Sequence, residues 1–213
     1  MKVTDRLKQN KKAHISFEIS PPPFGKGRER AFEIFDKLMK CSPDFVSITF
    51  HPEIIKYIPT IDDPNKRDMV VEKPKAGTLP LCSLLEGHYD TSVVQHLLCG
   101  GFSRNETAFA LKEMAYVNLD NVFALRGDPI IAHGQKKFEP YENGHSFASE
   151  LVNQIAQFNR KEYRDQKGVL ENIKTDFCIG VAGYPEKHYE SPNSAYDLMR
   201  LKEKVDKGAH FII

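Results

Sequence analysis

The chain has 213 residues, of which 40% are hydrophobic, so it can bury a sizeable core. Its formal net charge of +1 argues against nucleic acid and against an acidic membrane surface as partners. The four cysteines are widely spaced and form no Cys-x-x-Cys pair, so no metal site is predicted. The first residues lack the apolar core of a signal peptide, and no apolar run approaches about 18 residues. We therefore expect a cytoplasmic protein that does not span a membrane.

Strand-like and helix-like segments alternate along the chain. Short apolar runs bounded by turn signals predict strands, and apolar residues at a spacing of three to four predict helices between them. One helix start is especially clear, because Ser103 and Glu106 form a capping box. In chain order we expect a strand at 14–20, a helix at 28–40, strands at 45–50 and 93–99 flanking a helix at 78–86, a helix from 103 to about 117, a strand at 121–127, a helix at 147–160, a strand at 177–184, a helix at 193–207 and a strand at 210–213.

Residues 51–77 form the least regular stretch, rich in proline and charge. We expect a long loop excursion between the second strand and its helix, and loops of that length are usually functional or mobile. No shift in composition marks a domain boundary, so residues 1–213 are expected to form a single domain.

Alternation of strands and helices predicts βαβ units and a parallel sheet. No Gly-x-Gly-x-x-Gly follows a strand, so the dinucleotide fingerprint of the open doubly wound sheet is absent. Polar residues instead gather at the carboxyl ends of several strands, as in (β/α)₈ barrels. We therefore predict an α/β fold of the TIM-barrel type, with polar strand-end residues Glu18, Thr49, His96, Arg126, Asp128, Tyr184 and His188.

Two of these segments suggest chemistry. The run from Asn121 to Leu125 leads directly into Arg126-Gly-Asp128, which fits either a ligand site at a strand end or a solvated ion pair in a surface turn. Glu18 stands between Phe17 and Ile19, and burial there would favour its protonated form and suit a general acid. The alternative for Glu18 is an exposed edge, which Pro21 to Pro23 would fit.

The remaining candidates are ambiguous taken singly. His96 fits a buried core histidine as well as a catalyst, and His188 fits an ordinary loop residue. Tyr184 fits either packing or stacking on a flat ligand. Asp197 and Arg200 fit a helix ion pair, and Lys204 fits a solvated helix face. A metal site of His96, His188 and Asp128 has no ligand spacing to support it.

Taken together, the segments resemble the methylenetetrahydrofolate reductase family. The blocks appear in the family's order and span nearly the whole chain, and the ALRGD block together with YPE-x-H is the most specific pair. The matching blocks are SFEISPP (16–22), FVSITF (45–50), HLLC (96–99), NVFALRGDP (121–129), GVAGYPEKH (180–188) and YDLMRLKEKVDKGAHFII (196–213).

The resemblance implies a barrel that holds FAD at its carboxyl-end face. It also implies ping-pong chemistry, in which NADH or NADPH reduces FAD and 5,10-methylenetetrahydrofolate then receives the hydride to give 5-methyltetrahydrofolate. By this resemblance Glu18 is the general acid that helps to open the folate ring, and Asp128 lies near the flavin and holds the pterin. The positions that match flavin contacts are Thr49, Phe50, His96, Arg126, Gly127, Asp128, Phe147, Ala148, Tyr184, His188, Asp197, Arg200 and Lys204.

The sequence also departs from the family. Phe50-His51-Pro52 stands where the family usually has Tyr-Gly-Ala, and Phe147 replaces a common tyrosine. The family continues past the sixth strand with Thr-Gln, whereas this chain ends at Ile213. We therefore expect about six of eight β/α units, an open edge at 210–213 and a fragment of a longer enzyme, with weak FAD binding and little turnover as supplied.

Three classes of function stay open at this point. The first is the reductase, expected to be a homo-oligomer as family members are. The second is an inactive protein that still binds flavin or folate, or that is purely structural. The third is an unrelated barrel enzyme, such as a flavin-linked proline dehydrogenase relative or a metal-dependent aldolase, which the order of the motifs disfavours. No 2′-phosphate pocket is evident, so the sequence leaves NADH and NADPH as alternatives.

Overall fold

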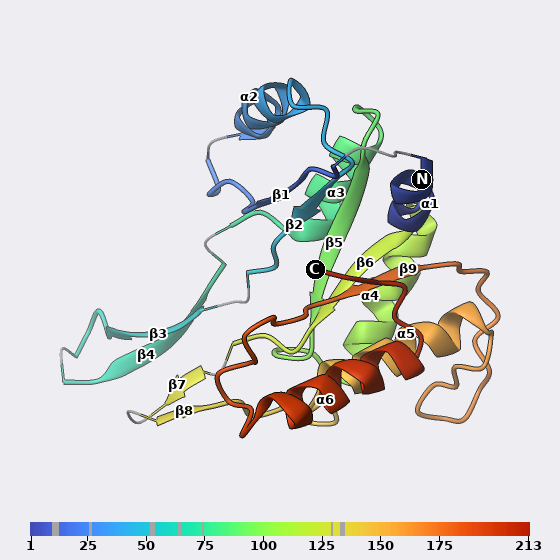
Figure 1. The fold of residues 1–213 in the computed structure, drawn as a ribbon. Helices are drawn as coiled ribbons and strands as arrows, with labels where there is room; N and C mark the ends of the chain where they lie inside the picture. Colours follow the sequence, from blue (N-terminus) through green and yellow to red (C-terminus); the bar gives the residue numbers. More distant parts are fainter. Residues whose placement is uncertain are drawn as a thin grey trace.

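The computed structural model describes residues 1–9, 13–25, 27–51, 54–63, 65–73, 75–128, 130–132 and 135–213. Its centre is a six-stranded parallel sheet, curled into a half barrel (Figure 1). The strand order is β1-β2-β5-β6-β9-β10, and the six predicted strands are confirmed. Their bounds are Ser16–Ile19 (β1), Phe45–Ile48 (β2), Ser92–Leu98 (β5), Asn121–Leu125 (β6), Cys178–Val181 (β9) and Phe211–Ile212 (β10).

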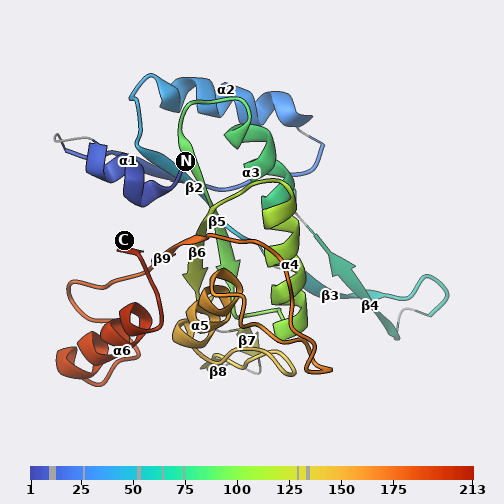
Figure 2. The same ribbon diagram turned by 90° about the vertical axis from the view of Figure 1, so that its right-hand side faces the viewer.

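The five predicted helices are also present. They are α2 (Gly27–Met39), α3 (Thr78–Glu86), α4 (Arg104–Tyr116), α5 (Ala148–Asn159) and α6 (Ser194–Asp206). The capping box forms at the start of α4, where the Ser103 and Glu106 side chains each accept a hydrogen bond from the other residue's backbone N–H. In Figure 2, α3 and α4 cover one side of the strands, and the chain termini with α1 lie on the other side.

Alternation along the strands separates two apolar clusters. The larger cluster lies between the sheet and its helices and includes Phe35, Leu85, Leu111 and Ile155. The smaller lies inside the curl of the sheet and contains Val3, Phe45, Val94, Phe123 and Cys178. Strands β2, β5, β6 and β9 are almost wholly buried, as expected for parallel strands covered on both faces.

Phe211 on β10 reaches across the inside of the curl. Its ring centroid lies 6.0 Å from that of Phe45 and 6.5 Å from that of Phe123. Gly180 makes room for it, because a Cβ at this position would lie 2.4 Å from the Phe211 ring. The curl is therefore filled by aromatic packing although β1 and β10 do not pair with each other.

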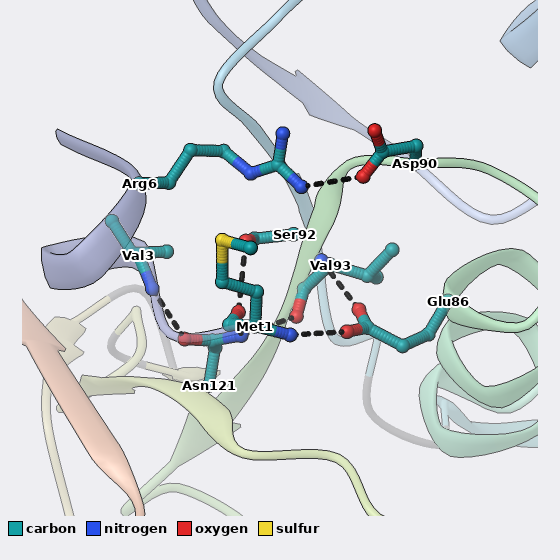
Figure 3. Close-up of polar contacts among 8 residues, drawn as sticks. All are labelled: Met1, Val3, Arg6, Glu86, Asp90, Ser92, Val93 and Asn121. Carbon is teal, nitrogen blue, oxygen red and sulfur yellow. Dashed lines mark hydrogen bonds and ion pairs between the residues drawn. The ribbon is translucent and has the colours of Figure 1, made fainter. Parts of the chain in front are cut away.

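A short amino-terminal helix, α1 (Val3–Gln9), closes the amino end of the curl and was not predicted. Figure 3 shows its polar anchor: the Asn121 side chain accepts from Val3 N at 2.9 Å and donates to Met1 O at 3.0 Å. Ser92 Oγ also donates to Met1 O at 2.8 Å, and the terminal amino group pairs with Glu86 at 3.3 Å. The helix depends on these distant partners, which local sequence patterns do not reveal.

Two antiparallel hairpins were also missed. Strands β3 (Ile54–Pro59) and β4 (Arg67–Glu72) pair within the predicted excursion, and β7 (Ile130–Ala132) pairs with β8 (Gln135–Lys137) after the Arg126-Gly-Asp128 turn. The β3–β4 hairpin projects away from the sheet (Figures 1 and 2) and leaves Tyr57 and Met69 exposed. The hairpin was not predicted because prolines and charged residues interrupt the alternation of apolar residues that indicates a strand. Three prolines of the predicted excursion, Pro52, Pro64 and Pro74, lie outside the described residues, as does Pro129 at the end of the NVFALRGDP block.

The sheet ends on an open edge, as expected. Ile212 and Ile213 are each about half exposed at this edge. Of the cysteines, Cys82, Cys99 and Cys178 are buried, whereas Cys41 is exposed. Among the described residues, every helix is too short or too polar to cross a lipid bilayer.

Candidate functional site

The polar strand-end residues lie along one edge of the sheet, because all six strands are parallel and their carboxyl ends meet there. Glu18 belongs to β1 and His96 to β5, while Thr49 and Arg126 follow β2 and β6 directly. These residues line what we call the mouth, the carboxyl-end opening of the curled sheet.

Glu18 and His96 form a close pair at the mouth. Glu18 Oε2 lies 3.6 Å from His96 Nε2. The His96 ring is only 3% exposed, and its Nε2 has no hydrogen-bond partner among the described residues. Burial, and secondarily the charge of His51, lowers the pKa of His96 to about 4. The imidazole is therefore neutral near pH 7.

Of the two interpretations of Glu18 that the sequence left open, the structure confirms the exposed edge and contradicts desolvation. The Glu18 side chain is 60% exposed, on the edge strand β1. Phe17 and Ile19 pack against the larger apolar cluster, on the opposite face of β1 from Glu18. Apolar neighbours in sequence therefore do not shield the carboxylate, which faces the mouth.

A cavity of about 270 Å³ opens beside the Arg126-Gly-Asp128 turn. The ends of β6 and β9, the segment 184–191, the start of α5 and one side of α6 surround it. Eight of the thirteen positions that we matched to flavin contacts line it: Arg126, Phe147, Ala148, Tyr184, His188, Asp197, Arg200 and Lys204.

Arg126 is held on two sides. Its guanidinium forms an ion pair with Glu190, and it lies 5.0 Å from the centroid of the Phe138 ring. The hydrogen bond from Arg126 is the largest cause that lowers the pKa of Glu190. Arg126 is 23% exposed in its side chain, so the pair is neither fully buried nor a freely solvated surface contact.

Two more cations stand on α6. The Arg200 guanidinium lies 3.9 Å from the centroid of the Phe147 ring and pairs with Glu203 at 2.7 Å. Lys204 Nζ donates to the carbonyl of Ala182, at the end of β9, at 2.6 Å. Burial lowers the pKa of Lys204, partly opposed by the nearby charge of Asp197. Lys204 is therefore a half-buried cation beside the cavity, rather than part of a solvated face.

The other matched positions are more dispersed. Tyr184 lies edge-on to His188 with ring centroids 4.8 Å apart, and burial raises the pKa of its hydroxyl. Gly127 has a φ of +88°, a backbone conformation that favours glycine and sets the turn. Asp128 is exposed. The five matched positions outside the cavity lining are Thr49, Phe50, His96, Gly127 and Asp128.

The lining offers cations and aromatic rings, the kinds of group that could hold a flavin dinucleotide. The guanidinium groups of Arg126 and Arg200 and the ammonium group of Lys204 suit a diphosphate. The rings of Tyr184 and Phe147 offer flat surfaces for stacking. Within the described part of the chain, no group of three or more His, Cys, Asp or Glu side chains is placed to hold a metal ion.

Sequence reasoning missed several polar residues of the mouth. Glu190, the partner of Arg126, lies two residues after His188 in the same turn, and an acidic residue so near a predicted site could have been flagged. Ser20 and Lys75 both contact His51, a residue considered only as a departure from the family pattern. That cluster forms because the excursion returns to the end of β1, which no local signal reveals.

The sequence matches the methylenetetrahydrofolate reductase family over residues 2–213. It is 32% identical to methylenetetrahydrofolate reductase (NADH) 1 of Arabidopsis thaliana over the whole chain, which covers 32% of that protein. It is 27% identical to 5,10-methylenetetrahydrofolate reductase of Salmonella typhimurium, covering 92% of this chain and 52% of the relative. The chain thus spans about a third of the Arabidopsis protein and about half of the Salmonella protein.

Among solved structures, a mandelate oxidase mutant with benzaldehyde is similar, with a TM-score of 0.52 at 9% sequence identity. The similarity covers 94% of this chain and 49% of the oxidase, and at this identity it concerns the fold alone. The family match, by contrast, extends over nearly every residue and includes the strand-end blocks of the mouth. The chain belongs to the methylenetetrahydrofolate reductase family.

Proposed function

We propose that residues 1–213 form part of a catalytic unit that uses FAD and NADH or NADPH to reduce 5,10-methylenetetrahydrofolate to 5-methyltetrahydrofolate. Family membership supports the folate reduction. The observation that best supports a flavin is the cavity at the mouth, where residues from four separate segments supply cations and aromatic rings. When bound, FAD would carry a hydride from the nicotinamide to the folate.

The proposed roles of the cavity residues follow from their charge. Arg126, Arg200 and Lys204 would bind the diphosphate and ribose of the flavin, with His188 beside them. Phe147 and Tyr184 would pack against its rings. Gly127 would bring the backbone of the turn close to the ligand. It has no side chain to obstruct that approach, and it adopts the positive φ of the turn without strain.

Glu18 would act as the general acid toward a ring nitrogen of the folate. Its exposure at the mouth gives a substrate access to the carboxyl group. The neutral imidazole of His96 lies beside it, with Nε2 3.6 Å from Glu18 Oε2. Asp128, also exposed at the mouth, would stabilise positive charge that develops on the folate ring.

The flavin site is tested by titrating FAD and following its fluorescence. Wild-type protein should bind, and Arg126→Ala should bind about tenfold more weakly, because one charged hydrogen bond is lost. Arg160→Ala is the matched control, since Arg160 pairs with Glu162 at the far end of α5. Equal affinity of wild type and Arg126→Ala would contradict the assignment.

The role of Glu18 is tested in the two half-reactions separately. In Glu18→Gln, bleaching of the flavin spectrum by NADH should persist, and reoxidation by methylenetetrahydrofolate should be lost. Equal loss of both half-reactions would refute the role of Glu18. A protein that binds flavin and bleaches with neither NADH nor NADPH would instead support the binding-only alternative.

A further inference from the structure

Four polar residues meet at the mouth outside the cavity described above. Ser20 follows β1, Thr49 and His51 follow β2, and Lys75 lies in the segment between β4 and α3. Backbone contacts bring Lys75 back to the end of β1: it forms a bridge with Pro23, and Ala76 N donates to Pro22 O at 3.4 Å. We call Ser20, Thr49, His51 and Lys75 the His51 cluster.

His51 is the centre of the cluster. Its Nε2 lies 2.6 Å from Ser20 Oγ, 3.0 Å from Thr49 Oγ1 and 3.1 Å from Lys75 Nζ. Lys75 also donates to Ser20 Oγ. Burial, and secondarily the charge of Lys75, lowers the pKa of His51. The ring is therefore neutral near pH 7, with the lone pair on Nε2 and the hydrogen on Nδ1.

The cluster carries one positive charge, on Lys75, which forms no ion pair with a carboxylate of the described residues. Within the described residues, no Asp or Glu oxygen lies within 4.0 Å of Lys75 Nζ, although the side chain is partly buried. Lysines of the nearby hairpin differ, since Lys56 pairs with Glu72 and Lys66 with Asp63. A partly desolvated cation without a counterion is costly unless a ligand supplies one.

The donors of the cluster define the class of ligand. The ammonium group of Lys75 has three N–H bonds, of which its two protein contacts use two, so one N–H and the positive charge are available to a ligand. A charged N–H donor favours an oxyanion. We propose that Lys75, held in place by Ser20 and by His51, which Thr49 also contacts, forms a subsite for a carboxylate or phosphate group.

The neighbourhood of the cluster connects it with the proposed reaction. Ser20 lies two residues past Glu18, so alternation along the chain directs both side chains to the same side of β1. His51 is close enough to His96 that protonation of the one ring disfavours protonation of the other. On the proposed function, on which this step rests, the oxyanion is either the diphosphate of the nicotinamide dinucleotide or the glutamate carboxylate of the folate.

The test observes the imidazole of His51 directly. Protein labelled with ¹⁵N-histidine is titrated with inorganic pyrophosphate and, separately, with 4-aminobenzoylglutamate, at constant ionic strength. A saturable shift of the His51 ring nitrogens is expected with at least one probe, and Lys75→Met should weaken that binding about tenfold. Response to pyrophosphate alone identifies the nucleotide as the source, and response to aminobenzoylglutamate alone identifies the folate.

Lys66→Met is the matched control, because Lys66 is an exposed lysine that already pairs with Asp63, and it should bind like wild type. If Lys75→Met fails to fold by circular dichroism, Ser20→Ala replaces it, since it loosens Lys75 without removing the charge. Absence of a saturable shift with both probes, or binding unchanged in the folded variant, overturns the subsite. These readouts need no flavin, so a failed subsite and a failed reductase activity are distinguishable.

Discussion

Two buried polar residues on neighbouring strands show how differently the two ends of the sheet are built. Asn121, at the amino end of β6, is fully buried, and its side chain bonds to Val3 N, Met1 O and Val93 O. His96, near the carboxyl end of β5, is 3% exposed, and its Nε2 has no hydrogen-bond partner among the described residues.

The amino end of the sheet stabilises the fold, whereas the carboxyl end is suited to a ligand. At the amino end, donors and acceptors from distant segments satisfy one another, so the contacts contribute to folding. At the mouth, the buried His96 Nε2 has no hydrogen-bond partner among the described residues. The charges of Glu18 and Lys75 there are available to a bound ligand. Such a division is expected for barrel folds, where function gathers at the carboxyl face.

The largest effect on stability is expected at the amino end. Asn121→Ala should lower the free energy of unfolding by about 3 kcal/mol, because it leaves the buried Val3 N–H without its acceptor and opens a cavity. Urea denaturation measures the loss. Asn153→Ala on α5 is the control and should change stability by less than about 0.5 kcal/mol. A loss below about 1 kcal/mol for Asn121→Ala would show that the contacts at the amino end contribute little to folding.

Unlike Asn121, His96 should make the protein less stable in acid. Its pKa is about 4 in the folded protein against 6.5 as a free side chain, so below pH 6.5 the unfolded state takes up the proton first. Stability should therefore fall as the pH drops from 6.5 toward 4, with His96 contributing about 2 kcal/mol of that loss at pH 5.

His96→Leu isolates this contribution, since His51, His145 and His210, whose pKa values are also lowered, are present in both proteins. The measurement is urea denaturation of both proteins from pH 8 to 5. The two curves should run parallel above pH 7 and diverge below 6.5, with the variant losing less stability. Parallel curves down to pH 5 would show that His96 is protonated in the folded state.

Ser103 lies near the mouth, but its side chain is fully hydrogen-bonded, so we expect it to contribute to stability and not to binding. Ser103→Ala removes the N-cap of α4 and should cost about 1 kcal/mol, measured by thermal denaturation. It should leave flavin affinity unchanged, because Ser103 does not line the cavity. A weakened flavin affinity would show that stability and binding are not separable at this end.

The smallest effect on stability is expected at the Arg126–Glu190 pair. Glu190→Gln should change the free energy of unfolding by less than about 1 kcal/mol, since both side chains retain solvent contact. Flavin should bind about threefold more tightly, because Arg126 then offers its full charge to a phosphate. FAD titration checks this, with Glu186→Gln as the exposed control. Weaker binding would mean that Glu190 positions Arg126 rather than competing with the ligand.

Local patterns were sufficient for the sheet and its helices. The six parallel strands are continuous apolar runs, and the cap at Ser103 depends on residues only three positions apart. Helix α1 and the β3–β4 hairpin could not be predicted in this way. Asn121 holds α1 from far along the chain, and the hairpin depends on pairing between two weakly apolar, charged segments.

The candidate site was predictable to a similar extent. Residues at strand ends could be named, because parallel strands bring their carboxyl ends together. The sequence left burial and an exposed edge open for Glu18, and burial is the wrong alternative, since residues adjacent in a strand point to opposite faces. The contact of Lys75 with His51 was not foreseen, because it requires the chain to return after the hairpin. Side-chain environments depend on tertiary packing, which local periodicity does not encode.

The anchor at Asn121 has a consequence for the rate of folding. It joins Val3 to a residue 118 positions later, and Phe211 reaches Phe45 from the other end of the sequence. Closing such long loops costs chain entropy before the contacts repay it, and parallel sheets of high contact order fold slowly. During synthesis, the first helix must wait for β6 to leave the ribosome, and the inside of the curl stays open until β10 follows.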